Sequence, residues 1–467
     1  MPLLLGVGPY GRFLRLRSTT RQKELGNLMV VAPTRKGKGL LAVSQLLTWP
    51  NSIVLNDIKG ELFELTAGYR ATLGPVFVLD PRGVGHQYDP LAACQDEDDC
   101  RAMAVHLLRK SLHDEPDPFI KRAIKMLTAI FRAGLLERAR LLPYAAHLLH
   151  IGPEDTAQRL QRISERHGLP PSQNLATRFL DRKLADADFS DRYLQSSWST
   201  LTGDMDAVIT EKVLRTVAGS DFTPEDILTG REETIDGKIV RRPVTVYLRF
   251  PEQRLHAHAP LIRLIWSSLL DDLTTVHDRR RGRDCKRTLA LFEEGGTAPV
   301  PGLKRFAATV AGRGISLVVM VQDHNQLESE YGRYDARSII NNMQTQLFYE
   351  QSGLETSEYI ERRLTKQSVY AHSKTIHENH QTVEGETEQA ASLLTVQDIS
   401  ELETDIIGVG PSRKPFRAKR MDWREYPELV ARTKIPPPAL PELAPIPEIP
   451  PLAKNQQTEF FDIDQGY

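Results

Sequence analysis

Short apolar runs separated by amphipathic stretches open the chain and predict strands that alternate with helices. The run 28–31 is followed by a polar, glycine-bearing turn and then by the apolar stretch 40–47, in the order strand, loop, helix. Two further apolar runs, 53–55 and 76–79, flank the helical pattern 61–69. Strands joined by helices are typical of βαβ units, so this region predicts a parallel sheet with right-handed crossovers.

The middle of the chain predicts helices only. From residue 96 to about 225, apolar residues recur at helical spacing and no alternating run interrupts them. Strand patterns return at 244–248, 288–292 and 315–321, and the last two are typical of buried strands in a parallel sheet. We therefore predict an α/β domain, with a mainly parallel sheet flanked by helices, that is split by an all-helical insertion.

The C-terminal end has a different composition. Eight prolines occur between Pro436 and Pro451, which favours extended polyproline II and cannot build a core, so we predict a disordered tail. The tail closes with the acidic-aromatic tip 459–464, which is either a docking motif or a disordered remnant. The predicted domains are 1–95 and 226–432 for the two parts of the α/β domain, 96–225 for the insertion and 433–467 for the tail.

Composition places the chain among ordinary globular proteins and narrows its partners. With 60 Lys and Arg against 61 Asp and Glu, the formal charge is −1, so any nucleic-acid contact must use a local basic patch. Three cysteines match no zinc or disulfide framework and fit a reducing compartment. No window reaches the ~18 apolar residues of a membrane span, and the apolar start lacks the basic flank of a signal peptide. We therefore expect a cytoplasmic protein without a transmembrane segment of its own.

Residues 32–39, Ala-Pro-Thr-Arg-Lys-Gly-Lys-Gly, lie where a phosphate-binding loop must lie, after a strand and before a helix. Gly37 lets the backbone curl so that N–H groups face inward, and Lys38 can reach the β- and γ-phosphates of a nucleotide. Two positions deviate from the usual pattern: Ala32 replaces the first glycine, and Gly39 replaces the hydroxyl residue that ligates Mg²⁺. The segment alone is equally compatible with a structural turn.

The second half of the chain supplies the acidic and polar groups that such a loop needs. The strand 288–292 runs into Glu293 and Glu294, where the first carboxylate would hold the Mg²⁺ shell and the second would polarise the attacking water. Gln322 ends the following strand and is suited to sense the γ-phosphate or its water. Arg313 is a candidate finger that reaches a neighbouring subunit's nucleotide. The alternatives without a catalytic role are a solvated strand end for the Glu pair and an ordinary cation at a helix end for Arg313.

These motifs resemble the type IV coupling proteins, the TraG-like and VirD-like ATPases of conjugation and type IV secretion. The resemblance covers roughly residues 28 to 425. It is most specific in Asn-Asp-Ile-Lys-Gly-Glu-Leu at 56–62, directly after the first strand–loop–helix unit. Further segments that carry it are 32–39, 63–70, 78–81, 313–315, 321–327, 331–332, 340–342 and 358–360.

The resemblance implies a RecA-like P-loop NTPase that binds ATP and Mg²⁺ between the subunits of a homo-hexameric ring. Such a ring binds DNA or a relaxase–DNA complex and passes it to a secretion channel. The resemblance also assigns residues: Lys38, Glu294, Gln322 and Arg313 to catalysis; Thr34, Arg35, Lys36, Gly37, Lys38, Gly39 and Leu40 to nucleotide binding; and Glu293 to Mg²⁺, through water. Asp57, Lys59 and Glu61 match the family signature beside the nucleotide site, without an assigned role.

Two departures from the family pattern bear on activity and location. Family members usually have Asp where this chain has Glu293, so hydrolysis could be slow or rely on intervening waters. They usually begin with transmembrane helices, whereas here the loop starts at residue 32. A separate secretion-channel or anchor protein would then hold the chain at the cytoplasmic face of the inner membrane. Two alternatives stay open: an FtsK-like or HerA-like double-stranded DNA motor, and an ATP-binding adaptor with little hydrolysis.

Basic residues cluster in two places, and either cluster is a DNA contact or a solvated surface. Trp198 is expected in the core of the insertion, and the Pro-rich tail is a further partner-binding candidate. His372, His377 and His380 lack the supporting ligands of a metal site. The basic residues are Arg159, Arg162, Arg166, Arg178, Arg182 and Lys183 in the insertion, and Arg279, Arg280, Arg281, Arg283, Lys286 and Arg287 in the loop 278–287.

Overall fold

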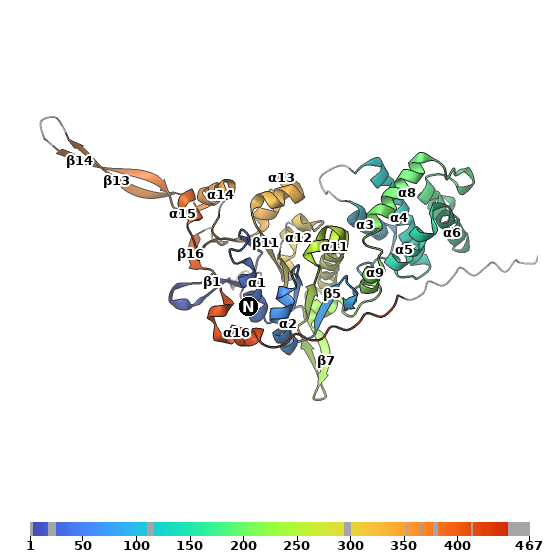
Figure 1. Cartoon of the computed structure of the whole chain (residues 1–467), viewed down its shortest axis with the longest axis horizontal. Helices are drawn as coiled ribbons and strands as arrows, with labels where there is room; N and C mark the ends of the chain where they lie inside the picture. Colours follow the sequence, from blue (N-terminus) through green and yellow to red (C-terminus); the bar gives the residue numbers. More distant parts are fainter. Residues whose placement is uncertain are drawn as a thin grey trace, which may run out of the picture.

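A computed structural model shows a twisted sheet with helices on both faces and a cluster of helices at one side of it (Figure 1). The cluster is the segment that we predict as an all-helical insertion. The structure describes residues 3–16, 25–109, 116–293, 300–351, 353–364, 366–376, 382–411 and 414–446.

The central sheet of the described residues has 12 strands, and its middle is parallel. β12, β3, β11, β10, β4, β9 and β5 pair in parallel, which confirms the predicted sheet, whereas strands at the two margins pair antiparallel. In spatial order the strands are β2 (Phe13–Leu16), β1 (Leu3–Val7), β16 (Pro415–Lys419), β15 (Asp405–Val409), β12 (Thr345–Phe348), β3 (Leu28–Val31), β11 (Ile315–Val321), β10 (Thr288–Phe292), β4 (Ile53–Asn56), β9 (Thr245–Leu248), β5 (Val76–Asp80) and β6 (Val84–Gly85).

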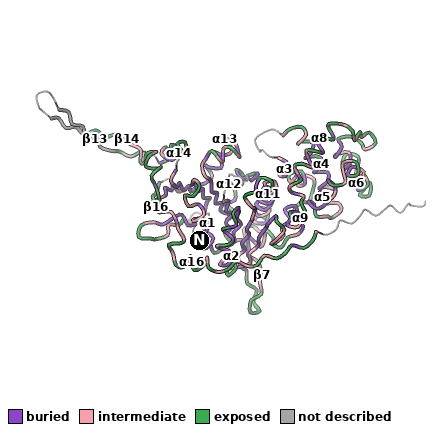
Figure 2. Tube along the Cα trace, viewed as in Figure 1, coloured by how far each residue is buried: buried purple, intermediate pink, exposed green. Residues whose placement is uncertain are grey.

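Helices cover both faces of the sheet because alternate strand residues point to opposite faces. Met29 and Val31 of β3 belong to one hydrophobic core, and Leu28 and Val30 belong to the other. Both cores are buried, so the strands read as continuous apolar runs (Figure 2). The helices of this domain are α1 (Lys38–Thr48), α2 (Glu61–Leu73), α11 (Leu255–Arg280), α12 (Leu303–Thr309), α13 (His324–Asn342), α14 (Leu354–Leu364), α15 (Val396–Ser400) and α16 (Pro427–Thr433).

The described part of the insertion contains helices and no strand, and it shares one of the two cores with the sheet domain. Trp198 is 9% exposed and packs edge-on against Phe179 at 5.9 Å, which confirms that it is a core residue. The helices are α3 (Glu97–Leu108), α4 (Pro118–Leu136), α5 (Leu141–Ile151), α6 (Pro153–Arg166), α7 (Leu175–Leu180), α8 (Arg192–Met205), α9 (Glu211–Val217) and α10 (Pro224–Thr229).

Two hairpins that the sequence analysis did not predict stand out from the sheet domain. β7 (Arg231–Ile235) and β8 (Lys238–Arg242) form a short hairpin that is largely exposed (Figure 2). β13 (Lys366–Ile376) and β14 (Thr382–Ser392) form a longer hairpin that extends away from the sheet (Figure 1). The side chain of His372 in β13 lies outside the described residues, as do His377 and His380.

The prediction of a disordered Pro-rich tail is wrong for the segment up to Ile446. The carbonyl oxygen of Pro441 accepts a hydrogen bond from the N–H of Gly85 at 2.8 Å, and Glu442 forms a β-bridge with Val84. Leu443 is buried. Proline lacks a backbone donor but keeps its acceptor, so this segment can line the edge of the sheet without a full ladder. The tip 459–464 lies outside the described residues.

Candidate nucleotide site

The loop between β3 and α1 has the backbone geometry of a phosphate cradle. Gly37 adopts a φ of 108° and caps the N-terminus of α1, while Arg35 adopts a φ of 65°. The N–H of Lys36 folds back onto the carbonyl oxygen of Pro33 at 3.3 Å. These left-handed residues turn successive N–H groups inward at a helix N-terminus, where the helix dipole favours an anion.

An acidic side chain from a distant part of the chain lies beside this loop. A Cβ placed on Gly39 would stand 3.8 Å from Oε1 of Glu293, which directly follows β10. Lys38, the first residue of α1, is buried. The loop and the acidic position therefore lie close enough to serve one Mg²⁺ nucleotide, as the sequence analysis requires. Glu294 lies outside the described residues, so its predicted role stays a prediction.

Gln322 completes the arrangement from the strand between the other two. β11 lies between β3 and β10 in the sheet, and Gln322 directly follows its last residue. The hydroxyl of Thr34 donates a hydrogen bond to Oε1 of Gln322 at 3.3 Å. The backbone N–H of Gln322 donates to Oε1 of Gln326 at 3.1 Å, in the first turn of α13. The amide thus sits at the loop on a fixed backbone, which suits a sensor of the terminal phosphate.

Three residues at this loop escaped the sequence analysis. Lys36 forms an ion pair with Glu350 at 2.5 Å, and Arg420 donates a hydrogen bond to the carbonyl oxygen of Lys36 at 3.3 Å. Tyr349 and Arg420 flank the position that a Cβ on Gly37 would take, at 3.7 and 3.5 Å. Tyr349 and Glu350 follow β12, and Arg420 follows β16. Both strands are short and contain too few apolar residues to be predicted from the hydrophobic pattern. The sequence signal that could have indicated this position was a cationic residue after a strand.

Asp57 has a structural role that its place in the family signature did not reveal. Its carboxylate accepts hydrogen bonds from the backbone N–H groups of Leu62 at 3.3 Å and Phe63 at 2.7 Å. It therefore caps the N-terminus of α2, which starts after Gly60 at a φ of 77°. Burial raises the pKa of Asp57 to about 6, although these hydrogen bonds oppose the shift. No comparable account arises for Lys59 and Glu61.

Arg313 lies at the opposite edge of the sheet from the loop. It precedes β11, whose seven residues separate it from Gln322 by about 23 Å. Its guanidinium donates to both oxygens of Asp278, at 2.9 and 2.7 Å, and this contact lowers the pKa of Asp278 to about 2. One chain therefore does not bring Arg313 to its own loop. A contact with a neighbouring subunit's nucleotide stays a prediction.

At least five of the twelve predicted basic residues pair with acidic side chains, which fits the alternative of a structured, solvated surface for those five. In the loop 278–287, Arg279 and Arg280 both pair with Glu225. Arg166 pairs with Glu137 at 2.9 Å and Arg182 with Asp191 at 3.2 Å in the insertion. Arg178 pairs with Glu97, and Arg159 is buried beside Tyr144. Among the described residues, no group of three or more metal-ligating side chains is present.

The sheet order, the curled loop and the acidic strand end define the class of the protein: a RecA-like P-loop fold that carries a helical insertion. The model of the family "Type IV secretory system Conjugative DNA transfer" matches residues 14–441. This chain therefore belongs to the type IV secretory system conjugative DNA transfer family, as the resemblance implied.

Individual relatives agree with the family match. The chain is 24% identical over 444 residues to Protein VirD4 of Rhizobium radiobacter, which covers 90% of this chain and 60% of that protein. It is 27% identical over 390 residues to the conjugal transfer protein TraG of Escherichia coli, with coverages of 77% and 57%. The chain thus spans about 60% of the length of these relatives.

The fold agrees with solved structures of a coupling protein. The plasmid coupling protein TrwB, in complex with a non-hydrolysable ATP analogue, superposes with a TM-score of 0.63 at 14% identity and covers 95% of this chain and 96% of its own. TrwB in complex with ADP and Mg²⁺ gives a TM-score of 0.61, with 14% identity and coverage of 85% of each chain. In the part of the chain that the structure describes, no helix combines the length and apolar character needed to cross a bilayer.

Proposed function

We propose that this chain binds and hydrolyses ATP with Mg²⁺, and that hydrolysis drives DNA or a relaxase–DNA complex toward a type IV secretion channel. The observation that carries the proposal is the convergence of Gly39, Glu293 and Gln322 at the carboxyl ends of three neighbouring parallel strands. Ligands of open α/β sheets bind at this edge. Family membership supports the cargo, since the family is one of conjugative DNA transfer.

The residues at the loop fit a magnesium nucleotide by their chemistry. Inward N–H groups, a lysine and a carboxylate are the donor set that holds a triphosphate and its metal ion. Mg²⁺ neutralises phosphate charge when it is bound. Lys38 holds the β- and γ-phosphates, and Glu293 orients the waters of the metal shell. Gln322 orients the attacking water, and Glu294 is the predicted group that polarises it.

The whole assembly belongs to the same proposal. We infer a homo-hexamer with ATP between subunits, in which Arg313 reaches the neighbouring nucleotide after exchanging its ion pair with Asp278. DNA is bound through local basic patches, and a partner at the inner membrane holds the ring at the channel. The structural relatives that carry a nucleotide support the ATP site, because they share this fold.

The test compares ATP turnover, with and without DNA, in the wild-type chain and in Lys38→Ala. Lys238→Ala is the matched control, because Lys238 is an exposed lysine on the β7–β8 hairpin. A motor shows DNA-stimulated turnover that Lys38→Ala abolishes and Lys238→Ala leaves unchanged. Nucleotide binding without turnover would support the adaptor alternative and refute the motor. Light scattering with ATP and DNA tests the ring.

A further inference from the structure

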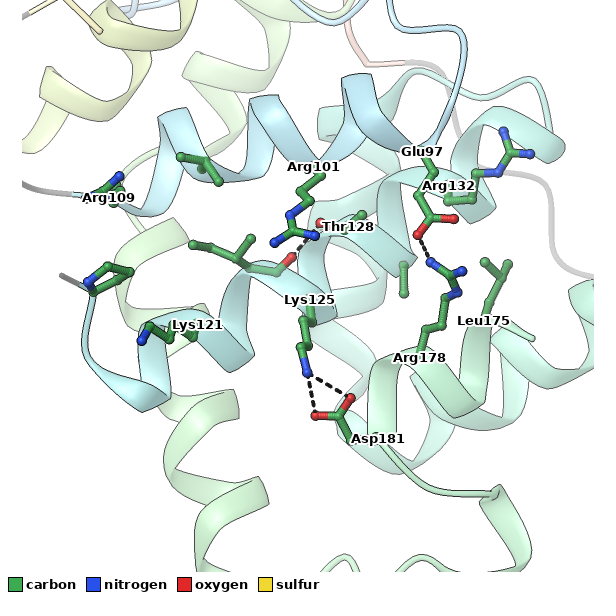
Figure 3. Close-up of a pocket in the computed structure, with 14 residues that line it drawn as sticks. Glu97, Arg101, Arg109, Lys121, Lys125, Thr128, Arg132, Leu175, Arg178 and Asp181 are labelled. Carbon is green, nitrogen blue, oxygen red and sulfur yellow. Dashed lines mark hydrogen bonds and ion pairs between the residues drawn. The ribbon is translucent and has the colours of Figure 1, made fainter. Parts of the chain in front are cut away.

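The helical insertion contains a basic groove that the nucleotide chemistry does not use. A cavity of about 470 Å³ opens between α3, α4 and α7 (Figure 3). Among the described residues that line it, two are acidic, Glu97 and Asp181, and six are cationic: Arg101, Arg109, Lys121, Lys125, Arg132 and Arg178. The excess of positive charge calls for an anionic occupant.

The cations follow the two longer helices as stripes. Arg101 and Arg109 lie eight residues apart along α3 and its C-cap, and Lys121, Lys125 and Arg132 recur along one side of α4. At 1.5 Å per residue these stripes run for about 12 and 16 Å. An extended chain of four or five residues has the same length, at about 3.3 Å each. The groove therefore fits an extended segment with several negative charges.

Some of this charge is already balanced, and some is not. Lys125 contacts Asp181 at 3.1 Å, and Arg178 pairs with Glu97 (Figure 3). Arg109 and Lys121 also have interaction partners. Arg101 reaches from α3 toward α4 in the same view, and Arg101 and Arg132 make no ion pair with any residue that the structure describes. These two arginines are the cations that an incoming carboxylate would meet first.

The floor of the groove favours a peptide over a nucleic acid. Val105, Ile124, Ala129 and Leu175 supply apolar surface, and no aromatic side chain is among the described lining residues. Single-stranded nucleic acid is usually held by aromatic side chains on which bases stack. A segment that alternates carboxylates with apolar side chains matches both the charge and the floor.

We propose that the C-terminal tip of this same chain, Glu-Phe-Phe-Asp-Ile-Asp at 459–464, docks in this groove. The sequence alternates three carboxylates with Phe460, Phe461 and Ile463, which is the pattern that the groove selects. The described chain ends at Ile446, which packs against the core that the insertion shares. Figure 1 shows this C-terminal segment running from α16 toward the insertion.

The tether that joins the tip to Ile446 sets how far the tip can reach. Twelve residues, 447–458, separate Ile446 from the tip, and an extended chain of that length reaches about 40 Å. A tether of this kind gives the tip an effective concentration on the order of 1 mM, so even a weak contact would be occupied.

The test measures binding of a fluorescein-labelled peptide of residues 455–467 to full-length chains by fluorescence polarisation, without nucleotide. One chain is wild type, and the other carries Phe460→Ser and Phe461→Ser, so that its own tip no longer competes. We expect the peptide to bind the substituted chain at least tenfold more tightly than the wild type. Arg101→Glu with Arg132→Glu, added to the substituted chain, weakens that binding at least tenfold. Arg162→Glu, an exposed charge reversal on α6 outside the groove, leaves it unchanged.

Three outcomes overturn the proposal. Equal binding to both chains, or no measurable binding to either, means that the tip is not the occupant. Loss of binding of a single-stranded oligonucleotide in the Arg101→Glu, Arg132→Glu chain, with peptide binding retained, assigns the groove to nucleic acid instead. Because no nucleotide is present, each result is independent of the ATPase proposal.

Discussion

The substitution Gly37→Ala adds one methyl group to the loop and tests whether its left-handed backbone conformation is needed for nucleotide binding. At a φ of 108° an L-residue is strained by about 1–2 kcal/mol, whereas the space around a new Cβ is adequate, with its nearest neighbour at 3.5 Å. The loop 33–36 is exposed or half-buried, so in Gly37→Ala its backbone can move to a conformation that has less strain but no longer binds phosphate. Nucleotide must then restore the curled loop, and its affinity falls about 5- to 30-fold.

Calorimetric titration of ADP and Mg²⁺ measures this loss. Gly314→Ala is the matched control, because Gly314 has the same left-handed conformation with a φ of 77°, no atom within 4 Å of a new Cβ, and a place before β11, at the end of that strand away from the loop. We expect the control to lower the free energy of unfolding by a similar 1–2 kcal/mol and to leave nucleotide affinity unchanged. If Gly37→Ala binds nucleotide as tightly as the wild type, the curled loop is not the phosphate cradle.

Three further predictions concern Gln322, Asp57 and the ordered C-terminal segment. Gln322→Ala should lower kcat at least tenfold with little change in nucleotide affinity, since the proposed role of the amide is to orient the attacking water; a matching loss of affinity, measured alongside turnover, would contradict that role. Because the pKa of Asp57 is raised to about 6, its stabilising contribution is complete below about pH 4 and is lost as the pH rises through 6. Urea unfolding should therefore show the wild type losing about 3 kcal/mol relative to Asp57→Asn between pH 4 and 7, and a constant difference would show that Asp57 keeps its ordinary pKa. A Cβ on Gly68 would stand 2.0 Å from the carbonyl oxygen of Ile435, so Gly68→Ala should displace the segment after α16 and speed its proteolysis, whereas Gly203→Ala, with open space around it, should not; equal cleavage rates in both variants would refute the packing of this segment.

The central strands could be predicted from sequence because burial on both faces leaves no ambiguity in their pattern. β3, β10 and β11 are continuous apolar runs, and the polar residues that follow them mark one edge of the sheet. The convergence of Gly39, Glu293 and Gln322 then follows from parallel topology alone. These three residues are far apart in the sequence, but they are close in space because the strands that precede them are neighbours in the sheet.

The missed parts have weaker patterns for physical reasons. β16 contains one buried residue, Ala418, among exposed and half-buried ones, so its sequence resembles a loop even though it positions Arg420 at the loop 32–39. Pro441 was assigned to a disordered tail because prolines cannot donate to a ladder, yet its carbonyl accepts a hydrogen bond from Gly85. For Arg313, the structure of one chain shows the ion pair with Asp278 and cannot test the predicted contact with a neighbouring subunit.

The place of β3 between β11 and β12 has a consequence for the synthesis of the protein. The ribosome must pass residue 348 before both sheet neighbours of the loop strand exist, some 317 residues after Val31 has been made. At about 5–20 residues per second this delay lasts roughly 15–60 s. A nascent or prematurely terminated chain that ends before residue 348 therefore carries the loop sequence without one of the strands that flank β3. We expect such a chain not to bind nucleotide through this loop.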